Sequence, residues 1–264
     1  MSGYGKVYLV GAGPGAPDLL TLRAARLLEQ ADIVLHDALV HPGTLALARN
    51  ARFLDVGKRY GKVSTEQRFI NRALVESARS HAIVVRLKGG DPMMFGRAQE
   101  EIEALEEAGI AYEVVPGVTA ALAAASVLGT SLTRRGVART VSFLTPRVGR
   151  GETSSEWLPA AIGADSVVLY MAAGASRSIA SELIAAGKPA TTPVALVESA
   201  TLPGESRRFT TLAALAAETL PKAAGPVVMC VGEVFRERAA VDRATRLDPG
   251  IRRDDDIPPI ALIA

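Results

Sequence analysis

A carboxylate and two glycines with the chemistry of a ligand site lie in the stretch VVRLKGGDPMMFGR, residues 84–97. The apolar, β-branched run that opens this stretch predicts a strand, and Gly89 and Gly90 free the backbone for the turn that follows. Asp91 comes next, and a charged helix is expected over residues 97–108. A strand, an acidic glycine turn and a helix form the kind of edge where α/β sheets bind ligands. Because turns favour Gly, Asp and Pro in any case, a tight turn with a solvated Asp91 is the alternative.

A second glycine loop, GAGPG at residues 11–15, directly follows an apolar run at residues 6–10. With Ala16 it satisfies the pattern GxGxxA, and Asp37 follows about 20 residues later, which is the layout of a dinucleotide-binding fingerprint. The proline inside the loop removes an amide that could hold phosphate, and Pro17 delays the helix whose N-terminus should face it. A glycine turn that serves only the passage from strand to helix is a further alternative.

Short apolar strands alternate with amphipathic helices through the first half of the chain, which predicts a mostly parallel sheet with helices on its faces. Asp18 is expected to cap the helix after the GAGPG loop. The acidic residues of the helix at 97–108 are expected on a solvated face, because Ala98, Ile102 and Leu105 form its inward stripe. In a parallel sheet the loops after successive strands line one edge, so both glycine loops and Asp37 should meet there. The expected strands are 6–10, 33–35, 53–56, 84–87 and 112–115.

The chain changes character after Pro116, where an alanine-rich helix, TAALAAASVLG, and a basic segment, TRRGVAR, lead into a second alternating set. We therefore expect an N-terminal α/β domain over residues 1–117 and a C-terminal α/β domain over 118–240, followed by a charged, proline-containing tail over 241–264. The strands of the second domain are expected at 141–144, 167–171, 194–197 and 227–231.

The composition excludes several classes of protein. The 264 residues are 48% hydrophobic and 22% charged with a net charge of +2, and contain no long basic block, so charge alone does not indicate a nucleic-acid partner. Cys230, the single cysteine, lies in an apolar run and is expected to be buried rather than nucleophilic. His36, His41 and His81 lack the spacing of metal ligands, so no metal is expected. No apolar run approaches ~18 residues, so we expect a cytoplasmic protein without a membrane segment.

Seven motifs in order give the chain a resemblance to a known family: VYLVGAGPGAPDLLTLRAARLLEQADIVLHDALV, VGKR, VVRLKGGDPMMFGR, VVPGVTAA, SLTRRGVA, TPVALVESAT and GPVVMCVGEV. The sequence resembles the uroporphyrinogen-III C-methyltransferases of the tetrapyrrole methylase family, in a stand-alone form without a fused sirohaem synthase region. The resemblance implies two α/β domains with mainly parallel or mixed sheets and a ligand cleft between them, and a homodimer. It also implies that two methyl groups pass from S-adenosyl-L-methionine (SAM) to C-2 and C-7 of uroporphyrinogen III. The products would be S-adenosyl-L-homocysteine and precorrin-2, a precursor of sirohaem and cobalamin.

The resemblance also implies roles for individual residues. Asp37 and Lys58 match the positions of the family's proton acceptor and proton donor. The SAM contacts carry over to Pro14, Gly89, Gly90, Asp91, Met94, Thr119, Ala120, Met171 and Ala200. Because the substrate carries carboxylate arms, arginines are expected to bind it, and the candidates are Arg59, Arg134, Arg135 and Arg139. This chain departs from the pattern at residues 145–147, where it reads TPR and many relatives read TGH, so no histidine can act there.

Three other functions stay open. A methyltransferase that acts on a later precorrin would use the same fold and the same donor. An NAD(P)-dependent oxidoreductase would use the GAGPGA loop together with Asp37. A ligand-binding module without catalysis would use the same loops.

Overall fold

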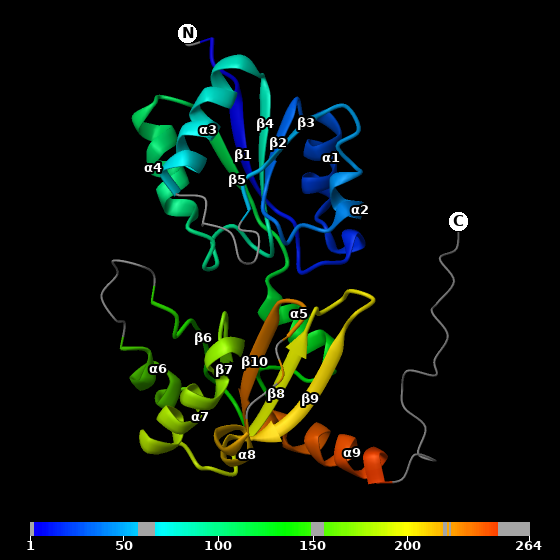
Figure 1. Cartoon of the computed structure of the whole chain (residues 1–264), viewed down its shortest axis with the longest axis vertical. Coiled ribbons are helices and arrows are strands. Elements are labelled where there is room, and N and C mark those ends of the chain that lie inside the picture. Colours follow the sequence, from blue (N-terminus) through cyan, green and yellow to red (C-terminus); the bar gives the residue numbers. More distant parts are fainter. Residues whose placement is uncertain (1–2, 58–66, 149–155, 219–220, 222, 248–264) are drawn as a thin grey trace. The chain divides into compact units, whose positions relative to one another are not determined.

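The structure is a computed structural model, and it describes residues 3–57, 67–148, 156–218, 221 and 223–247. These residues form two compact units (Figure 1). The first unit extends to Ala124 and also includes Ser199–Glu205, whereas the second consists of Ala125–Glu198 and the chain from Ser206 onward. The domain boundary expected between residues 117 and 118 lies a few residues before the boundary between the two units. The sequence gives no sign that a segment near residue 200 belongs to the first unit.

The first unit is built on a five-stranded sheet with the order β3-β2-β4-β1-β5. All neighbouring strands are parallel, as the alternation of strands and helices predicts. Parallel strands run in one direction, so the loops after them share one edge of the sheet. The strands are β1 (Lys6–Gly11), β2 (Ile33–His36), β3 (Arg52–Asp55), β4 (Ile83–Lys88) and β5 (Tyr112–Val115).

Two helices cover each face of this sheet (Figure 1). On one face α1 (Leu22–Gln30) and α2 (Pro42–Leu45) pack on the strands, with Leu28 fully buried. On the other face α3 (Gln67–Ser80) and α4 (Ala98–Glu107) do so. Helices α1, α3 and α4 each present an apolar stripe to the sheet, which is the pattern expected for the outer layers of an α/β unit.

Helix α1 begins later than the sequence predicts. Its N-cap is Thr21, whose side-chain oxygen accepts a hydrogen bond from the Ala24 amide at 3.1 Å. Asp18 lies instead in a separate 3-10 turn, η1 (Pro17–Leu19), and Leu20 returns the backbone to an extended conformation. The prediction that Asp18 caps the helix is therefore wrong, because Pro17 starts a turn that ends before the helix begins.

The second unit contains a five-stranded mixed sheet with the order β6-β7-β10-β8-β9. Strands β6 and β7 are parallel, and the other neighbours are antiparallel. The sequence did not predict β9, because its residues, SRRFTT, are too polar to be recognised as a strand, and it lies at the edge of the sheet. The strands are β6 (Val141–Leu144), β7 (Ser166–Leu169), β8 (Pro193–Glu198), β9 (Ser206–Thr211) and β10 (Val227–Gly232).

Three helices of the second unit pack against this sheet around one apolar core: α6 (Trp157–Gly163), α7 (Ser176–Ala185) and α8 (Leu212–Ala217). Helix α5 (Ala120–Val127) begins in the first unit and ends in the second, and the short turns η2 (Ala173–Ala175) and η3 (Glu233–Phe235) precede α7 and α9.

The last described helix, α9, spans Arg236–Leu247. Its second half lies in the stretch 241–264, which the sequence predicts to be a charged tail. The helix continues because RERAAVDRATRL contains neither proline nor glycine and consists mostly of good helix formers. Within the described residues, no helix has the length and apolar character needed to span a bilayer.

Three glycines bring the ends of β1, β4 and β5 into backbone contact. They are Gly11 at the end of β1, Gly90 after β4 and Gly117 after β5. A Cβ atom on Gly117 would lie 2.4 Å from the Gly90 carbonyl oxygen and 2.8 Å from the Gly11 Cα atom. A Cβ on Gly11 would lie 2.6 Å from the Gly117 Cα atom. No side chain fits at these two positions unless a backbone moves.

Replacing Gly117 with Ala should lower the free energy of unfolding by roughly 1–3 kcal/mol, because the new methyl group overlaps backbone atoms that cannot rotate away. Urea denaturation monitored by circular dichroism measures the change. Gly89→Ala is the matched control, because its Cβ would meet only the Leu39 Cβ atom, at an ordinary 3.8 Å, among the described residues. Equal stability of Gly117→Ala and the parent protein would contradict the backbone contact.

Candidate functional site

The loops after β1 and β4 are joined by a pair of backbone hydrogen bonds. We call residues 12–16 the β1 loop and residues 89–97 the β4 loop. The Gly90 amide donates to the Gly13 carbonyl at 2.7 Å, and the Gly13 amide donates to the Gly90 carbonyl at 3.2 Å. Both glycines have left-handed φ angles, +72° at Gly13 and +68° at Gly90, which other residues rarely adopt. Pro14 therefore follows directly on a point where the two loops are fixed to each other.

Asp91 connects the β4 loop to the end of β5. Its Oδ2 atom accepts a hydrogen bond from the Gly117 amide at 2.9 Å, and its Oδ1 atom accepts one from the Met93 amide at 2.8 Å. The solvated turn acid of the alternative interpretation is therefore wrong, since the carboxylate joins two loops. Each carboxylate oxygen can accept more than one hydrogen bond, so Asp91 keeps acceptor capacity for a ligand.

Gly90 also lies beside the start of α5. A Cβ on Gly90 would have the Ala120 amide nitrogen and the Thr119 Cα atom as neighbours, both at 3.9 Å. Thr119 is buried, with 8% of its surface exposed, and α5 begins at Ala120. A helix N-terminus presents backbone amides and a partial positive charge. The structure thus brings Gly90, Asp91, Thr119 and Ala120 together at one edge of the first sheet.

Gly89 is a glycine that the fold itself does not require. Its φ angle lies outside the left-handed range, and a Cβ would meet only the Leu39 Cβ, at 3.8 Å, among the described residues. A glycine that neither backbone conformation nor packing requires leaves its backbone uncovered. Such glycines are found where a ligand approaches the chain closely.

Strained backbone occurs next to several other predicted donor contacts. Phe95 and Arg97, which follow Met94 in the β4 loop, have left-handed φ angles of 53° and 57°. Met171 itself has a φ of 55°, and it lies in the second unit with 47% of its surface exposed. Such conformations cost roughly 1–3 kcal/mol each and concentrate at functional sites. Ala200 lies in the Ser199–Glu205 segment of the first unit and is 8% exposed.

Asp37, the predicted proton acceptor, is held by a buried arginine. The Arg86 guanidinium donates to Asp37 Oδ1 at 2.6 Å, with side-chain exposures of 3% for Arg86 and 31% for Asp37. The other carboxylate oxygen, Oδ2, accepts only a long hydrogen bond, at 3.4 Å, from the Gly89 amide among the contacts described for this side chain. One oxygen of Asp37 is therefore anchored in the core and the other faces the β4 loop.

A second carboxylate, the fully buried Glu101 of α4, also holds Arg86. Glu101 Oε1 accepts hydrogen bonds from Arg86 Nε at 3.0 Å and from Lys88 Nζ at 2.8 Å. Gln67 of α3 reaches the same oxygen at 3.4 Å. The prediction that the acidic residues of this helix all face solvent is wrong for Glu101, which is fully buried. It turns inward because two cations of β4 lie beneath the helix.

The network of Asp37, Arg86, Lys88 and Glu101 contains two positive and two negative charges. Burial, and next the charge of Arg86, lower the pKa of Lys88 below its ordinary value of 10.5, while Glu101 opposes this effect. Sequence reasoning overlooked Arg86, Lys88 and Glu101. The available signal was an arginine and a lysine two residues apart within an otherwise apolar parallel strand, which places both on one face of a buried sheet.

The predicted substrate arginines that the structure describes lie in the second unit. Arg134 forms an ion pair with Glu237 of α9 at 2.9 Å. Arg139 donates through its backbone amide to Asp165 at 2.8 Å, and the side chains of Arg135 and Arg139 are exposed. In the TPR segment, the Arg147 amide donates to the Thr145 hydroxyl at 3.3 Å. Arg59, the remaining predicted substrate arginine, and Lys58, the predicted proton donor, lie outside the described residues.

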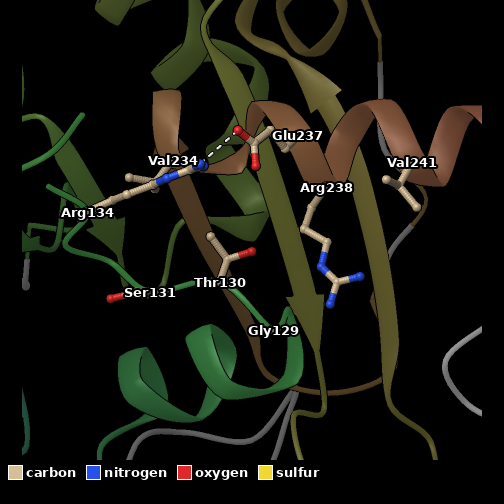
Figure 2. Close-up of a pocket in the computed structure, with 8 residues that line it drawn as sticks. All are labelled: Gly129, Thr130, Ser131, Arg134, Val234, Glu237, Arg238 and Val241. Carbon is tan, nitrogen blue, oxygen red and sulfur yellow. Dashed lines mark ion pairs between the residues drawn. The ribbon is translucent and has the colours of Figure 1, made fainter. Parts of the chain in front are cut away.

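A pocket of about 380 Å³ lies in the second unit (Figure 2). Arg134 and Glu237, which form the ion pair drawn as a dashed line in Figure 2, both line it. Of the predicted site residues that the structure describes, only Arg134 lines this pocket, and a second pocket of about 340 Å³ beside β9 and α9 contains none. Glu237 already compensates the charge of Arg134, and Arg238 is the other arginine in the lining.

Cys230 is fully buried in β10, as its apolar context predicts. Burial raises the pKa of its thiol to about 12, so it stays protonated and cannot act as a nucleophile. Over the residues that the structure describes, no group of three His, Cys, Asp or Glu side chains gathers closely enough to hold a metal ion.

The geometry disfavours a dinucleotide site. The helix that should hold the pyrophosphate begins at Leu22, after an intervening 3-10 turn, rather than directly after Gly15.

The family model of tetrapyrrole (corrin/porphyrin) methylases matches residues 6–216. A uroporphyrinogen-III C-methyltransferase of Sinorhizobium sp is 44% identical over 250 residues, which cover 92% of this chain and 89% of that protein. A siroheme synthase of Azotobacter vinelandii is 45% identical over 236 residues, or 89% of this chain and 51% of that protein. The chain thus spans about half the length of the siroheme synthases that it matches.

Among solved structures, the chain is similar to a uroporphyrin-III C-methyl transferase from Thermus thermophilus complexed with S-adenyl homocysteine. The sequence identity is 42% and the TM-score 0.77, and the match covers 88% of this chain and 100% of that one.

Replacing Glu101 with Leu should lower the free energy of unfolding by about 3–5 kcal/mol, because it leaves two cations buried with one carboxylate removed. Chemical denaturation measures the loss. The same substitution at Glu103, an exposed residue of the same helix, should change stability by no more than ~0.5 kcal/mol. Similar values for the two variants would contradict the role given to Glu101.

Proposed function

The chain belongs to the tetrapyrrole methylase family, and on that premise we propose that it converts uroporphyrinogen III to precorrin-2 by SAM-dependent methylation at C-2 and C-7. The observation that carries the proposal is the similarity to the Sinorhizobium methyltransferase, which extends over nearly all of both chains. The product would serve sirohaem or cobalamin synthesis.

The loops at the edge of the first sheet fit the methyl donor. Gly89 leaves open backbone where a Cβ would stand. The next residue, Gly90, lies beside the Ala120 amide and Thr119, and Asp91 supplies a carboxylate. Backbone amides and carboxylates suit the polar amino-acid and ribose groups of SAM, whose sulfonium supplies an electrophilic methyl group. We assign donor binding to these five residues together with Pro14, Met94, Met171 and Ala200. We propose that methyl transfer at this site uses no metal.

Asp37 is suited to accept the proton that the methylated ring carbon must lose. Arg86 holds Oδ1 at 2.6 Å and so fixes the carboxylate, whereas Oδ2 keeps a lone pair that can take a proton. A fixed acceptor lowers the entropy cost of reaching the reactive geometry. Lys58 is assigned the role of proton donor from the family resemblance.

The carboxylate arms of the substrate call for arginine partners. We assign them to Arg135 and Arg139, whose guanidinium groups are exposed, together with Arg59 and Arg134. Arg134 can serve only if it exchanges Glu237 for the substrate. We further propose that the protein acts as a cytoplasmic homodimer with a small-molecule substrate and no nucleic-acid partner, as the resemblance and the nearly neutral charge suggest.

The proposal is tested by incubating the protein with SAM and enzymatically made uroporphyrinogen III and analysing the tetrapyrroles by mass spectrometry. We expect a doubly methylated product and two equivalents of S-adenosylhomocysteine. A protein that binds SAM but methylates only later precorrins would replace the proposed substrate. Binding of NADH or NADPH without binding of SAM would overturn the methyltransferase assignment altogether.

Gly89→Val should weaken SAM binding by at least tenfold, because its branched side chain fills the open surface over the β4 loop, while the fold tolerates it. Calorimetric titration with S-adenosylhomocysteine measures the dissociation constant, and thermal unfolding checks the fold. Gly163→Val is the control, since Gly163 ends α6 in the second unit, has nothing within 4 Å of its Cβ position among the described residues and is not a predicted donor contact. Unchanged affinity of Gly89→Val would remove Gly89 from the donor site.

A further inference from the structure

The loop between β8 and β9, residues Ser199–Glu205, is a compact turn that belongs to the first unit although both of its strands belong to the second. The Leu202 amide donates to the Ser199 carbonyl at 3.0 Å, and the Glu205 amide donates to the Leu202 carbonyl at 2.9 Å. The Thr201 amide donates to the Glu205 carboxylate at 2.8 Å. These bonds give the loop a defined shape of its own.

This loop contacts the β1 loop at two adjacent residues. The Thr201 hydroxyl accepts a hydrogen bond from the Ala16 amide at 3.1 Å. The Leu202 side chain lies against Gly15, where an added Cβ would be only 2.7 Å from Leu202 Cγ. The end of the β1 loop is therefore held by one polar and one apolar contact from a segment far along the chain.

The two contacts coincide with backbone strain. Ser199 and Thr201 have left-handed φ angles of 51° and 70°. For a β-branched residue such as Thr201 this conformation is a marked outlier, and it persists only where the surroundings enforce it. Neither strained residue is a glycine, although glycine would relieve the strain. The side chain of Thr201 therefore has a use that outweighs the strain.

The role of the Thr201 side chain follows from the residue that lies between the two fixed ends of the β1 loop. Gly13 is joined to Gly90 at one end, and Gly15 and Ala16 contact the 199–205 loop at the other. Pro14 lies between them. We propose that Thr201 and Leu202 are positioning residues for the methyl-donor site, which hold the β1 loop so that Pro14 and the Gly89–Gly90 backbone form one surface. The inference rests on the proposed function.

Replacing Thr201 with Val keeps the shape of the side chain and removes the acceptor of the Ala16 amide. We expect the dissociation constant of S-adenosylhomocysteine and the KM for SAM to rise about tenfold, the effect of leaving one amide without its partner. The kcat at saturating SAM should stay within about twofold of the parent value, because the hydroxyl does not touch the reacting atoms. Thr201→Ser, which restores the hydroxyl, should restore the affinity.

Thr191→Val is the matched control, since Thr191 is an exposed threonine of the second unit and its substitution should leave the affinity unchanged. Should Thr201→Val fail to fold, Leu202→Ala gives the same test, because it removes the contact with Gly15 from a side chain that is only partly buried. We expect Leu202→Ala to weaken donor binding about threefold to tenfold.

Two outcomes separate this inference from the proposed function. If the parent protein binds SAM and both variants bind it equally well, the positioning role is wrong and the proposed function stands. If the parent protein binds neither SAM nor S-adenosylhomocysteine, the proposed function fails and the positioning role fails with it.

Discussion

The Gly90 carbonyl and the backbones of Gly11 and Gly117 lie so close together that no side chain fits at Gly11 or at Gly117. This contact joins the ends of β4, β1 and β5, three neighbours in one parallel sheet. Asp91 reinforces it by accepting the Gly117 amide. Because the loops are fixed by the strands beneath them, the surface above them is formed before any ligand arrives, which lowers the entropy cost of binding. Gly89 leaves that surface open.

The buried ion network under the sheet edge is a second constraint on the site. Glu101 and Arg86 are almost completely buried, and Arg86 extends the ion network to Asp37 at the sheet edge. Burying such charges costs desolvation energy that apolar residues would avoid, so a buried network is weak evidence for stability. The position of the network beneath Asp37 and the β4 loop explains its presence better than stability does. The network fixes one oxygen of the carboxylate assigned to proton transfer.

The parallel first sheet and its shared loop edge could be predicted, because hydrophobic alternation and glycine turns are local signals. Features that depend on contacts between distant residues could not. Glu101 resembles any surface acid until Arg86 and Lys88 lie beneath it, and Asp91 resembles a turn residue until Gly117 donates to it. The Thr201 contact with Ala16 joins residues far apart in sequence. Strand β9 was overlooked because an edge strand needs no apolar face, and the cap of α1 because Pro17 began a separate turn.

We infer that the loops after β1, β4 and β5 form a preorganised surface for the methyl donor. A crystal structure of the protein with S-adenosylhomocysteine tests it most directly. We expect the ligand to lie against the backbone of Gly89 and Gly90 and the start of α5, with the Gly13–Gly90 and Asp91–Gly117 hydrogen bonds intact. A ligand bound away from these loops, or loops that separate to admit it, would show that the surface is not preformed for the donor.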